Sequence, residues 1–500
     1  MIDAIVADEH DNVATAIRDL EPGTITTSDG PAQLNTSLRT GHKLSLADIQ
    51  AGAHIVKYGE IIGVALDPIR AGDHVHVHNV GDLLGSTRKV GTAARANLPV
   101  LEARPPRLGS WDAAELQAST FEGYRRTQGR PGIRNQLLVL ATVGCSTVVA
   151  QRIASLTGAA VITHNQGCLQ LGADLAMTRK QLAGAAANPN VGAVLYVGLG
   201  CETIQCAQLM EELVGKPSAA LTIQEAGGTR ATVDRGYAMA RELQRELELG
   251  KRETFPLSEL VIATKCGGSD GLSGLTANPA TGVACDMLVD AGAAVVLSET
   301  PGLFGSEPHL AARMPRPEDR ERLSSVLDDV WEESVRLGEL MSEGEMSPGN
   351  IDGGLTTLVE KSLGATTKAG TRAFQGFVEM ADPIPGPGLW LMDTPGFDIV
   401  TISAQAAGGA QMILFTTGRG SPVGCAIAPV LKICSNSKTY GWMEDDMDVN
   451  AGANVTEGLS IDSVGREIFE RVCETASGKP TSTETEGHGE FALARIGSTL

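Results

Sequence analysis

The chain has 500 residues, a net charge of −20 and only 4% aromatic residues. This length exceeds what a single hydrophobic core supports, so we expect several domains whose cores rely on Ala, Val, Leu and Ile. The acidic charge, without any stripe of Lys and Arg, argues against binding to nucleic acid or to an anionic membrane.

The first 95 residues are predicted to form a small β-rich domain. Two segments, HIVKYGEIIGVAL and GDHVHVHNV, combine β-branched residues with glycine punctuation and predict strands. The alternation in VHVHNV places His74, His76 and His78 on one face of such a strand. Residues 96–122 mix proline, charge and small residues, which predicts a linker.

After the linker, apolar strands and helical segments alternate. The strand NQLLVLATVG is followed by the helix STVVAQRIASLTG, which Gly158 is expected to end. This alternation predicts a parallel sheet covered by helices over residues 123–260. A second set of strands begins at ELVIATKCGG and predicts another α/β domain over 261–500, with a helix over 317–343 and an irregular stretch over 344–372. The fold class is therefore α/β, with a small β domain followed by two α/β domains whose sheets are mostly parallel.

Polar, glycine-rich turns follow many of the predicted strands, for example TVGCS, HNQGC and GLGCE. The longest is KCGGSDGLSGLTANPATG, residues 265–282, in which five of eighteen residues are Gly. Ligands of α/β sheets bind at the carboxyl ends of strands, and glycine exposes backbone N–H groups there. We therefore expect these turns to line one shared site, with residues 265–282 as one of its walls.

Histidines and cysteines supply two sets of candidate metal ligands. The alternating histidines could bind a metal through neutral imidazoles or could form an ordinary polar sheet face, and His42 is interpreted as an ordinary loop residue. Four cysteines come directly after predicted strands: Cys145, Cys168, Cys201 and Cys266. They could be small buried residues, or their thiolates could hold iron, alone or in a cluster. Their wide spacing in the sequence makes a cluster the less favoured option.

The cysteine pattern and the lack of export signals predict that the protein is located in the cytoplasm. The nine cysteines are scattered and form no CxxC pair, which is typical of free thiols in a reducing environment. The N-terminal segment lacks the basic start and apolar core of a signal peptide, and no apolar run is long enough to span a membrane. We expect a cytoplasmic protein.

Charged residues in the same turns leave several roles open. The carboxylates there could ligate a hard cation, act as bases or cap helices; they are Glu202, Glu225, Asp270, Glu299 and Glu307. Lys265 could be a base, an anchor for a carboxylate or a solvated lysine. The basic stretch GYRRTQGRPGIRN and Arg419 could seat an anionic substrate or form interdomain salt bridges. The glycine patterns of a Walker A loop, a dinucleotide-binding turn and a hydrolase elbow are absent.

Taken together, these motifs resemble the altronate/galactarate dehydratase family along nearly the entire chain. The resemblance is carried by DNVATAI, GHK, KYG, GDHVHVHN, YRRTQGRPGIRN, TVGCS, HNQGC, GLGCE, CGGSDGLSGLTANP, PGN, GGLTTLVEKSLG, FTTGRGSP, DVNAG and ARIGSTL. The single-chain layout is more like that of altronate dehydratases than that of relatives split into two subunits. The resemblance implies an N-terminal SAF-type β domain and two α/β domains. It also implies loss of water from a hexonate or hexarate, giving a 2-keto-3-deoxy acid, with a divalent metal, commonly Fe²⁺ or Mn²⁺.

On this basis we assign expected roles in a reaction in which a base removes the α-hydrogen and an acid helps to expel the β-hydroxyl. The expected catalytic residues are His76, His78, His164, Lys265 and Asp270. The expected substrate-binding residues are Arg126, Arg134, Ser269, Ser273, Asn278 and Arg419. The expected metal ligands are His76, His78, Cys168, Cys201, Glu202 and Cys266. We expect Fe²⁺, with Mn²⁺ or Mg²⁺ as alternatives, a small sugar acid as the ligand, and a homodimer.

The chain departs from the family pattern at several turns, which leaves the substrate open. The departures are Asp8 where family members often have His, Asn188, Gly302, Ile351 and Asp352. Two alternatives therefore stand beside dehydration. The chain could be a sulfo-lyase that releases sulfite from sulfolactate, or a sugar-acid-binding protein without catalysis.

Overall fold

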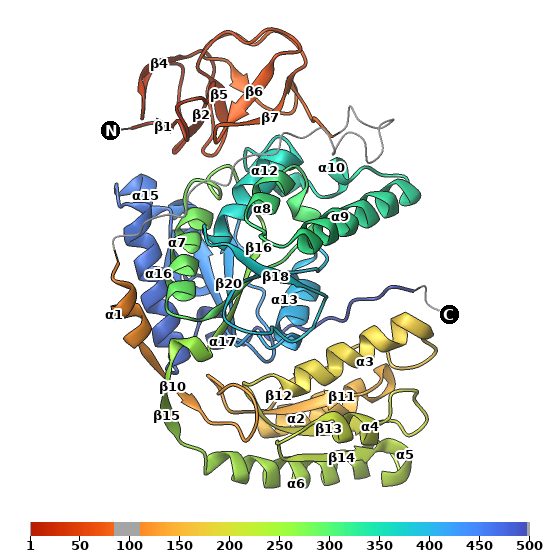
Figure 1. Cartoon of the computed structure of the whole chain (residues 1–500). Helices are drawn as coiled ribbons and strands as arrows, with labels where there is room; N and C mark the ends of the chain where they lie inside the picture. Colours follow the sequence, from red (N-terminus) through yellow and green to blue (C-terminus); the bar gives the residue numbers. More distant parts are fainter. Residues whose placement is uncertain (1, 85–110, 498–500) are drawn as a thin grey trace.

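The computed structural model describes residues 2–84 and 111–497, which form three domains arranged in a row (Figure 1). The N-terminal β domain lies at one end of the row and the middle α/β domain at the other, with the C-terminal α/β domain between them. This arrangement, with its mostly parallel sheets, confirms the predicted fold class.

The N-terminal domain contains a six-stranded sheet in the order β4-β3-β1-β2-β5-β8 and a three-stranded sheet in the order β6-β7-β9. The strands are β1 (Ala4–Ile5), β2 (Val13–Ala16), β3 (Gly23–Thr27), β4 (Gly30–Leu34), β5 (Lys43–Ser45), β6 (His54–Lys57), β7 (Glu60–Ala65), β8 (His74–Val75) and β9 (Val80–Gly81). Strands β5 and β8 pair antiparallel, with Leu44 opposite His74. This pairing brings residue 42 close to residues 74–76.

The strand predicted through VHVHNV is shorter than expected. β8 ends at Val75, and residues 76–79 form a turn that Asn79 holds. The Asn79 side chain accepts from the N–H of His76 at 2.9 Å and donates to the carbonyl of His74 at 2.9 Å. An Asn side chain that bonds nearby backbone in this way replaces ladder hydrogen bonds with a turn. The prediction of three histidines on one strand face is therefore wrong, and His78 is exposed in the turn.

The middle domain is a four-stranded parallel sheet in the order β12-β11-β13-β14, covered by helices on both faces. Its strands are β11 (Gln136–Ala141), β12 (Ala160–Ile162), β13 (Val191–Gly198) and β14 (Ser218–Thr222). Its helices are α2 (Thr147–Thr157), α3 (Gly172–Ala187), α4 (Cys206–Glu212), α5 (Ile223–Ala226) and α6 (Thr229–Glu248). Gly158 ends α2 in the left-handed conformation, as its position predicted.

The C-terminal domain contains a seven-stranded parallel sheet in the order β18-β19-β17-β16-β20-β21-β22. Its strands are β16 (Val261–Cys266), β17 (Ala294–Leu297), β18 (Phe374–Val378), β19 (Gly388–Met392), β20 (Met412–Thr417), β21 (Val430–Cys434) and β22 (Val449–Asn450). Its helices are α7 (Ala277–Asp290), α8 (Glu307–Ala312), α9 (Pro317–Leu337), α10 (Met341–Gly344), α11 (Pro348–Asp352), α12 (Leu358–Thr366), α13 (Asp398–Ala407), α14 (Ser437–Trp442), α15 (Ala453–Thr456), α16 (Ile461–Ala476) and α17 (Ser482–Thr485).

Two local predictions for this domain are wrong. The helix predicted over 317–343 stops at Leu337, because Gly338 adopts a left-handed conformation and closes α9. The stretch predicted as irregular, 344–372, contains the almost entirely buried helix α12. A helix buried on all sides has no polar face and so lacks the periodicity that reveals an amphipathic helix.

Two strands form a ribbon that joins the middle and C-terminal domains. β10 (Thr120–Tyr124) enters the middle domain and β15 (Arg252–Pro256) leaves it, and the two pair antiparallel. Residues 96–110 of the predicted linker lie outside the described residues, and the rest of it forms α1 (Ala113–Ala118) and part of β10.

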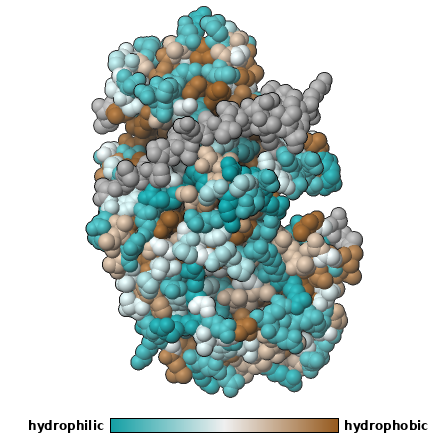
Figure 2. Space-filling model, in the orientation of Figure 1, coloured by the Kyte–Doolittle hydropathy of each residue, from teal (hydrophilic) through white to brown (hydrophobic). Residues whose placement is uncertain are grey.

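Hydrophilic residues cover most of the face seen in Figure 2, and hydrophobic ones gather there only in small groups. Among the described residues, the structure contains no helix with both the length and the apolarity needed to cross a membrane.

Candidate functional site

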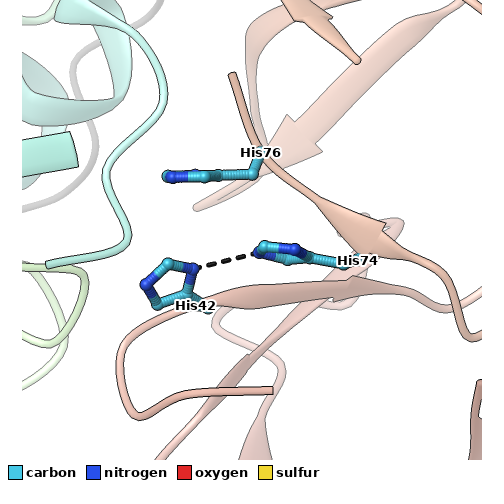
Figure 3. A group of neighbouring side chains, drawn as sticks. All are labelled: His42, His74 and His76. Atoms are coloured by element: carbon cyan, nitrogen blue, oxygen red, sulfur yellow. Dashed lines mark hydrogen bonds between the residues drawn. The ribbon is translucent and has the colours of Figure 1, made fainter. Parts of the chain in front are cut away.

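Three imidazoles meet where the N-terminal domain faces the C-terminal domain (Figure 3). His42 precedes β5, His74 opens β8 and His76 follows β8, and we call them the histidine group. The Nδ1 of His42 lies 3.0 Å from the Nε2 of His74, and the rings of His74 and His76 stack with centroids 5.2 Å apart. In the part of the chain that the structure describes, this is the one set of three His, Cys, Asp or Glu residues whose ligand atoms all lie within 4.8 Å of one another.

The surroundings of the histidine group keep its imidazoles neutral, which is the form that binds metals. Burial and the neighbouring His42 lower the pKa of His74 to about 4 and that of His76 to about 3. The Nε2 of His42 lies 3.1 Å from the carbonyl oxygen of Asp352, so this nitrogen carries the hydrogen and Nδ1 keeps its lone pair. Within the described residues, the buried Nδ1 of His76 has no hydrogen-bond partner. The donor set therefore fits a divalent transition metal.

Close glycine contacts bring the histidine group against the C-terminal domain. A Cβ on Gly41 would lie 2.6 Å from the carbonyl oxygen of Gly353, and one on Gly271 would lie 1.9 Å from the carbonyl oxygen of Gly41. Only residues without side chains allow this approach. The N–H of Gly271 also donates to the carbonyl of Gly353 at 2.8 Å. The turn after β16 and the end of α11 thus form the floor beneath His42.

A charged hollow of about 350 Å³ lies beside this floor. We call it the arginine hollow; its polar lining includes Arg39, Asp270, Asp352, Arg419, Asn436 and Lys438. The carboxylate of Asp352 lies 3.0 Å from Arg39 and 2.9 Å from Arg419. Because the carbonyl of Asp352 also contacts His42, this residue connects the hollow to the histidine group. Its volume is in the range of small-molecule sites.

A second pocket, of about 150 Å³, lies within the C-terminal domain behind the same turns. We call it the Cys266 pocket; its lining includes Cys266, Ser269, Glu299, Asn350, Lys368 and Asp398. The Nζ of Lys368 lies 3.2 Å from the Sγ of Cys266 and 2.8 Å from Glu299. Burial alone would raise the pKa of Glu299, but the ammonium groups of Lys265 and Lys368 outweigh it and lower the pKa to about 2. The pocket therefore holds buried ion pairs rather than free bases.

Lys265 does not suit the role of base that was predicted for it. Its ammonium group contacts Glu299 and lies 3.0 Å from Asp398. Burial by itself would lower the pKa of Lys265, but these carboxylates raise it above its ordinary value. A lysine that stays charged has no lone pair to accept a proton, and the thiol of Cys266 beside it contacts Lys368 and Glu299, not the histidine group.

The stretch 265–282 is mostly interior, and only its first residues line the two pockets described above: 266–269 the Cys266 pocket and Asp270 the arginine hollow. Ser269 lines the Cys266 pocket, but Ser273 donates to Asp270, and Asn278 bonds the carbonyl of Gly364 and the hydroxyl of Thr416. The Asp270 carboxylate accepts from four groups: the N–H of Leu272, the hydroxyls of Ser273 and Ser435, and the amide of Asn436. These residues build the turn, and only Asp270 also reaches the arginine hollow.

Two arginines predicted to bind substrate have structural partners instead, Arg126 within the middle domain and Arg134 across to the C-terminal domain. Arg126 donates to the carbonyls of Pro189 and Arg134 and to the side chain of Asn135. Arg134 forms a bidentate ion pair with the carboxylate of Glu484 in α17, with N···O distances of 2.7 and 2.8 Å. The salt-bridge alternative that the sequence left open is therefore the observed one for Arg134, whereas Arg419 does line a hollow.

His164 has both ring nitrogens occupied by backbone groups. Its Nε2 donates to the carbonyl of Ala141 at 2.8 Å, and its Nδ1 accepts from the N–H of Gln166 at 3.1 Å. Burial lowers its pKa to about 4. His164 thus shapes a turn of the middle domain, and the predicted catalytic role finds no support in these contacts.

The predicted convergence of histidines and cysteines on one metal does not occur within one chain. Cys168, Cys201 and Glu202 belong to the middle domain, on the far side of the C-terminal domain from His76 and His78 (Figure 1). Glu202 is buried and accepts from the N–H groups of Leu199 and Gly200. Conversely, His42 belongs to the group although it was interpreted as an ordinary loop residue, and His74 belongs to it although it was a candidate only through the alternating histidines and not in the assigned ligand set. The signal that could have revealed His42 is its motif, GHK, among those shared with the family.

The changed residues of the turns have local partners. Asp8 pairs with His10 at 2.8 Å and is not part of the histidine group. Asn188 donates to the carbonyls of Ala406 and Ala410 and so bridges two domains.

Three family models match successive parts of this chain. They are the altronate/galactarate dehydratase SAF domain at residues 2–83, the D-galactarate dehydratase/altronate hydrolase second domain at 123–248 and the D-galactarate/altronate dehydratase C-terminal domain at 257–499. Altronate dehydratases of Bacillus subtilis and Escherichia coli are 34% and 35% identical to it, each over 98% of this chain and 98% of the relative. The chain belongs to the altronate/galactarate dehydratase family.

This membership confirms the predicted SAF domain and the predicted enzyme class, a carbon–oxygen lyase of the hydro-lyase type. Another relative covers less of the chain. The β subunit of (2R)-sulfolactate sulfo-lyase from Chromohalobacter salexigens is 36% identical over 76% of this chain and 99% of that subunit.

Proposed function

We propose that this chain is a metal-dependent sugar-acid dehydratase that acts at the histidine group. Its substrate would be a hexonate such as altronate or a hexarate such as galactarate, and its product a 2-keto-3-deoxy acid. The observation that carries the proposal is the histidine group between two domains, in a chain similar over its whole length to altronate dehydratases. We further propose that the enzyme is a homodimer, which sedimentation velocity of the purified chain would test. We also propose that it works in the cytoplasm.

Removing the hydrogen next to a carboxylate places a second negative charge on the substrate, so the site must stabilise that charge. His42, His74 and His76 would hold a divalent cation, Fe²⁺ in the first instance and Mn²⁺ otherwise, whereas Mg²⁺, the other metal expected from the sequence, prefers oxygen ligands to imidazoles. When bound, the cation would supply Lewis-acid stabilisation of the substrate oxygens. The neutral imidazoles contribute lone pairs without adding charge of their own.

The residues of the arginine hollow would orient the sugar acid. Arg39 and Arg419 offer guanidinium groups to a carboxylate, and Asn436 and Thr40 offer hydrogen bonds to hydroxyl groups. The exposed imidazole of His78, whose ring centroid lies 5.4 Å from that of His74, is our candidate for the group that accepts the proton. These roles keep His76, His78 and Arg419 from the predicted set and add His42, His74 and Arg39.

The test is an anaerobic assay of the full chain with a panel of hexonates and hexarates and with Fe²⁺, Mn²⁺ or Mg²⁺, read out as keto acid formed. We expect turnover of at least one hexonate or hexarate that depends on added metal and is lost in His74→Ala. The matched control is His54→Ala, an exposed histidine of the same domain. Release of sulfite from sulfolactate without turnover of any sugar acid would replace this proposal with the sulfo-lyase alternative, which the similarity to the sulfo-lyase subunit favours. Tight binding of hexonates without any product would point to a binding protein.

A further inference from the structure

Three Gly-Cys pairs lie at one edge of the middle domain, away from the site proposed above. Cys145 follows β11, Cys168 follows β12 and Cys201 follows β13. These strands are neighbours in a parallel sheet, in the order β12-β11-β13, so their carboxyl ends lie side by side. Of the nine cysteines, these three are exposed, and the other six are buried or half-buried.

Backbone hydrogen bonds join the three cysteine turns. The N–H of Gly144 donates to the carbonyl of Gln166 at 2.9 Å, which links the Cys145 turn to the Cys168 turn. The N–H of Thr203 donates to the carbonyl of Gly167 at 3.1 Å, which links the Cys168 turn to the Cys201 turn. The three thiols are therefore carried by one connected unit of structure.

The glycine before each cysteine allows these turns to approach one another. A Cβ would lie 3.1 Å from the Cα of Asn165 at Gly144, 2.3 Å from the carbonyl oxygen of Thr142 at Gly167, and 2.7 Å from the side chain of Gln224 at Gly200. Gly167 and Gly200 also have positive φ, of 101° and 121°. Glycine is thus required at Gly167 by a backbone contact and by its φ, and at Gly200 by its φ, while at Gly144 it allows a close approach to Asn165.

Polar side chains fix the Cys201 turn and reach its sulfur. Buried Glu202 accepts from the N–H groups of Leu199 and Gly200 and, at 2.9 Å, from the hydroxyl of Thr142 at the end of β11. The amide of Gln224 donates to the Sγ of Cys201 at 3.6 Å. Hydrogen bonds to cysteine sulfur are one means by which proteins tune thiolate-bound iron. Glu202, predicted as a metal ligand, instead holds the turn that carries Cys201.

The chemistry of the thiols, and the fact that they do not form a tight group, indicate which ligand they suit. Thiolates favour zinc, copper(I) and iron–sulfur clusters. Among the described residues, the only three ligand atoms that lie within 4.8 Å of one another are those of the histidine group, so the three sulfurs are spread more widely than that. A cluster, in which sulfide bridges several irons, bonds its thiolates to different metal atoms and accepts a wider spread than one ion does.

We propose that Cys145, Cys168 and Cys201 hold an iron–sulfur cluster. Sulfide-bridged clusters commonly have four cysteine ligands, so three thiolates leave one iron with a position for a ligand that is not a cysteine. This site is separate from the divalent cation proposed at the histidine group, and its existence does not depend on the proposed sugar-acid reaction.

The experiment reconstitutes the full chain anaerobically with ferrous iron and inorganic sulfide, removes unbound reagents, and measures iron, acid-labile sulfide and the electron paramagnetic resonance of the reduced protein. We expect sulfide in amounts matching the iron, and at least a tenfold loss of sulfide in the triple variant Cys145→Ser/Cys168→Ser/Cys201→Ser. His74→Ala should retain the sulfide even if it loses the divalent cation, and the matched control Cys473→Ser should behave as wild type. A wild-type chain that binds no sulfide, or a triple variant that keeps it, would overturn the proposal.

A second measurement covers the case in which the triple variant fails to fold. Wild-type protein, with and without reconstitution, is treated with iodoacetamide and digested, and alkylation of each cysteine is quantified by mass spectrometry. We expect the reconstituted protein to be protected at Cys145, Cys168 and Cys201 and unchanged at Cys473. Equal labelling of the three cysteines in both samples would contradict the assignment.

Discussion

The Nζ of Lys43 lies 2.9 Å from the Oε2 of Glu360, and both side chains are fully buried between the SAF domain and helix α12. Lys57 contacts the other oxygen of the same carboxylate at 2.8 Å. Burial alone would raise the pKa of Glu360, but the two ammonium groups outweigh it and lower the pKa. Because Lys43 directly follows His42, this ion triad fixes the position of the histidine group against the C-terminal domain.

Replacing Glu360 with Gln should destabilise the protein strongly, because two buried ammonium groups would lose their counter-charge. We expect a loss of about 3–5 kcal/mol in the free energy of unfolding, the range found when one partner of a buried ion pair is removed. Urea denaturation followed by circular dichroism measures it, and the exposed Glu457→Gln is the matched control. A loss below about 1 kcal/mol, the value of a surface ion pair, would contradict the role of the triad.

The same carboxylate predicts an acid dependence of stability. The pKa of Glu360 is lower in the folded protein than in the unfolded chain, so its contribution is complete above the ordinary carboxyl pKa and is lost as the pH falls below it. Wild type and Glu360→Gln should therefore differ most in stability near neutral pH, and the difference should shrink below about pH 4. A difference that grows on acidification would have the wrong sign for this assignment.

Truncating His74 should remove a metal ligand without disturbing the fold of the other domains. We expect His74→Ala to bind Fe²⁺ or Mn²⁺ about 100-fold more weakly or worse, since even indirect partners of metal ligands are worth 10–100-fold in affinity. Equilibrium dialysis with metal analysis, beside His54→Ala, measures this effect. The test is repeated in a His74→Ala variant in which Cys145, Cys168 and Cys201 are also replaced. If that variant binds as much metal as the wild type, the histidine group is not a metal site.

Asp352 should weaken the binding of anionic substrates, because its carboxylate already occupies Arg39 and Arg419. The substitution Asp352→Asn keeps the shape of the side chain and frees both guanidinium groups. Since exposed ion pairs are worth up to about 1 kcal/mol, we expect KM for a sugar acid to fall by roughly two- to fivefold, with little change in kcat. Steady-state kinetics of the variant beside the exposed control Asp67→Asn provide the measurement, and a raised KM would show that Asp352 assists binding.

Cys266 should tolerate replacement by Ser as far as metal binding is concerned. Its sulfur contacts Lys368 and Glu299 inside the Cys266 pocket, and a serine hydroxyl can make the same kinds of contact. We expect Cys266→Ser to keep its bound divalent metal within about twofold of wild type, at a stability cost of about 1 kcal/mol. Metal analysis of the variant decides the point, with His74→Ala as the positive control for loss. Metal lost from Cys266→Ser would restore the sequence-based assignment of Cys266 as a ligand.

The parallel sheets were predictable because their strands are short apolar runs, whereas helix α7, which begins within the stretch 265–282, was not predicted. Nearly every residue of α7 is buried, and its sequence, ANPATGVACDMLVD, consists mainly of small and apolar residues without a polar face. An amphipathic period cannot arise in such a helix. Its start was therefore interpreted as part of a long loop that binds ligand.

The site was harder to predict than the fold because it depends on contacts between distant segments. His42 lies next to His74 because strands β5 and β8 pair, and no local pattern in TGHKLSL predicts that pairing. Arg134 and Arg419 are the same residue type in glycine-containing turns, yet one binds Glu484 and the other lines a hollow. Their difference follows from which domain surface each one faces, and that is a property of the folded molecule.

The buried side chain of Lys432 should lower the free energy of unfolding at neutral pH, and should lower it by less at alkaline pH. Its buried Nζ has no hydrogen-bond partner among the described residues and lies 3.5 Å from the ring centre of Phe415. Burial lowers its pKa to about 7, so between that pH and the ordinary lysine pKa of 10.5 the unfolded chain binds more protons than the folded protein. The free energy of unfolding of the wild type therefore increases as the pH rises through this interval, because the cost of burying Lys432 decreases.

We expect Lys432→Met to be more stable than wild type by about 1–3 kcal/mol near pH 7, since Met fills the same space without a buried, unpartnered polar group. The advantage should shrink by about pH 9.5, where the wild type folds with a neutral amine that costs less to bury. Urea denaturation of both proteins at the two pH values gives the difference, and the exposed Lys251→Met serves as the control. A variant that is less stable than wild type near pH 7 would mean that the contact with Phe415 outweighs the cost of burial, and an advantage independent of pH would mean that the ammonium is not the source of the effect.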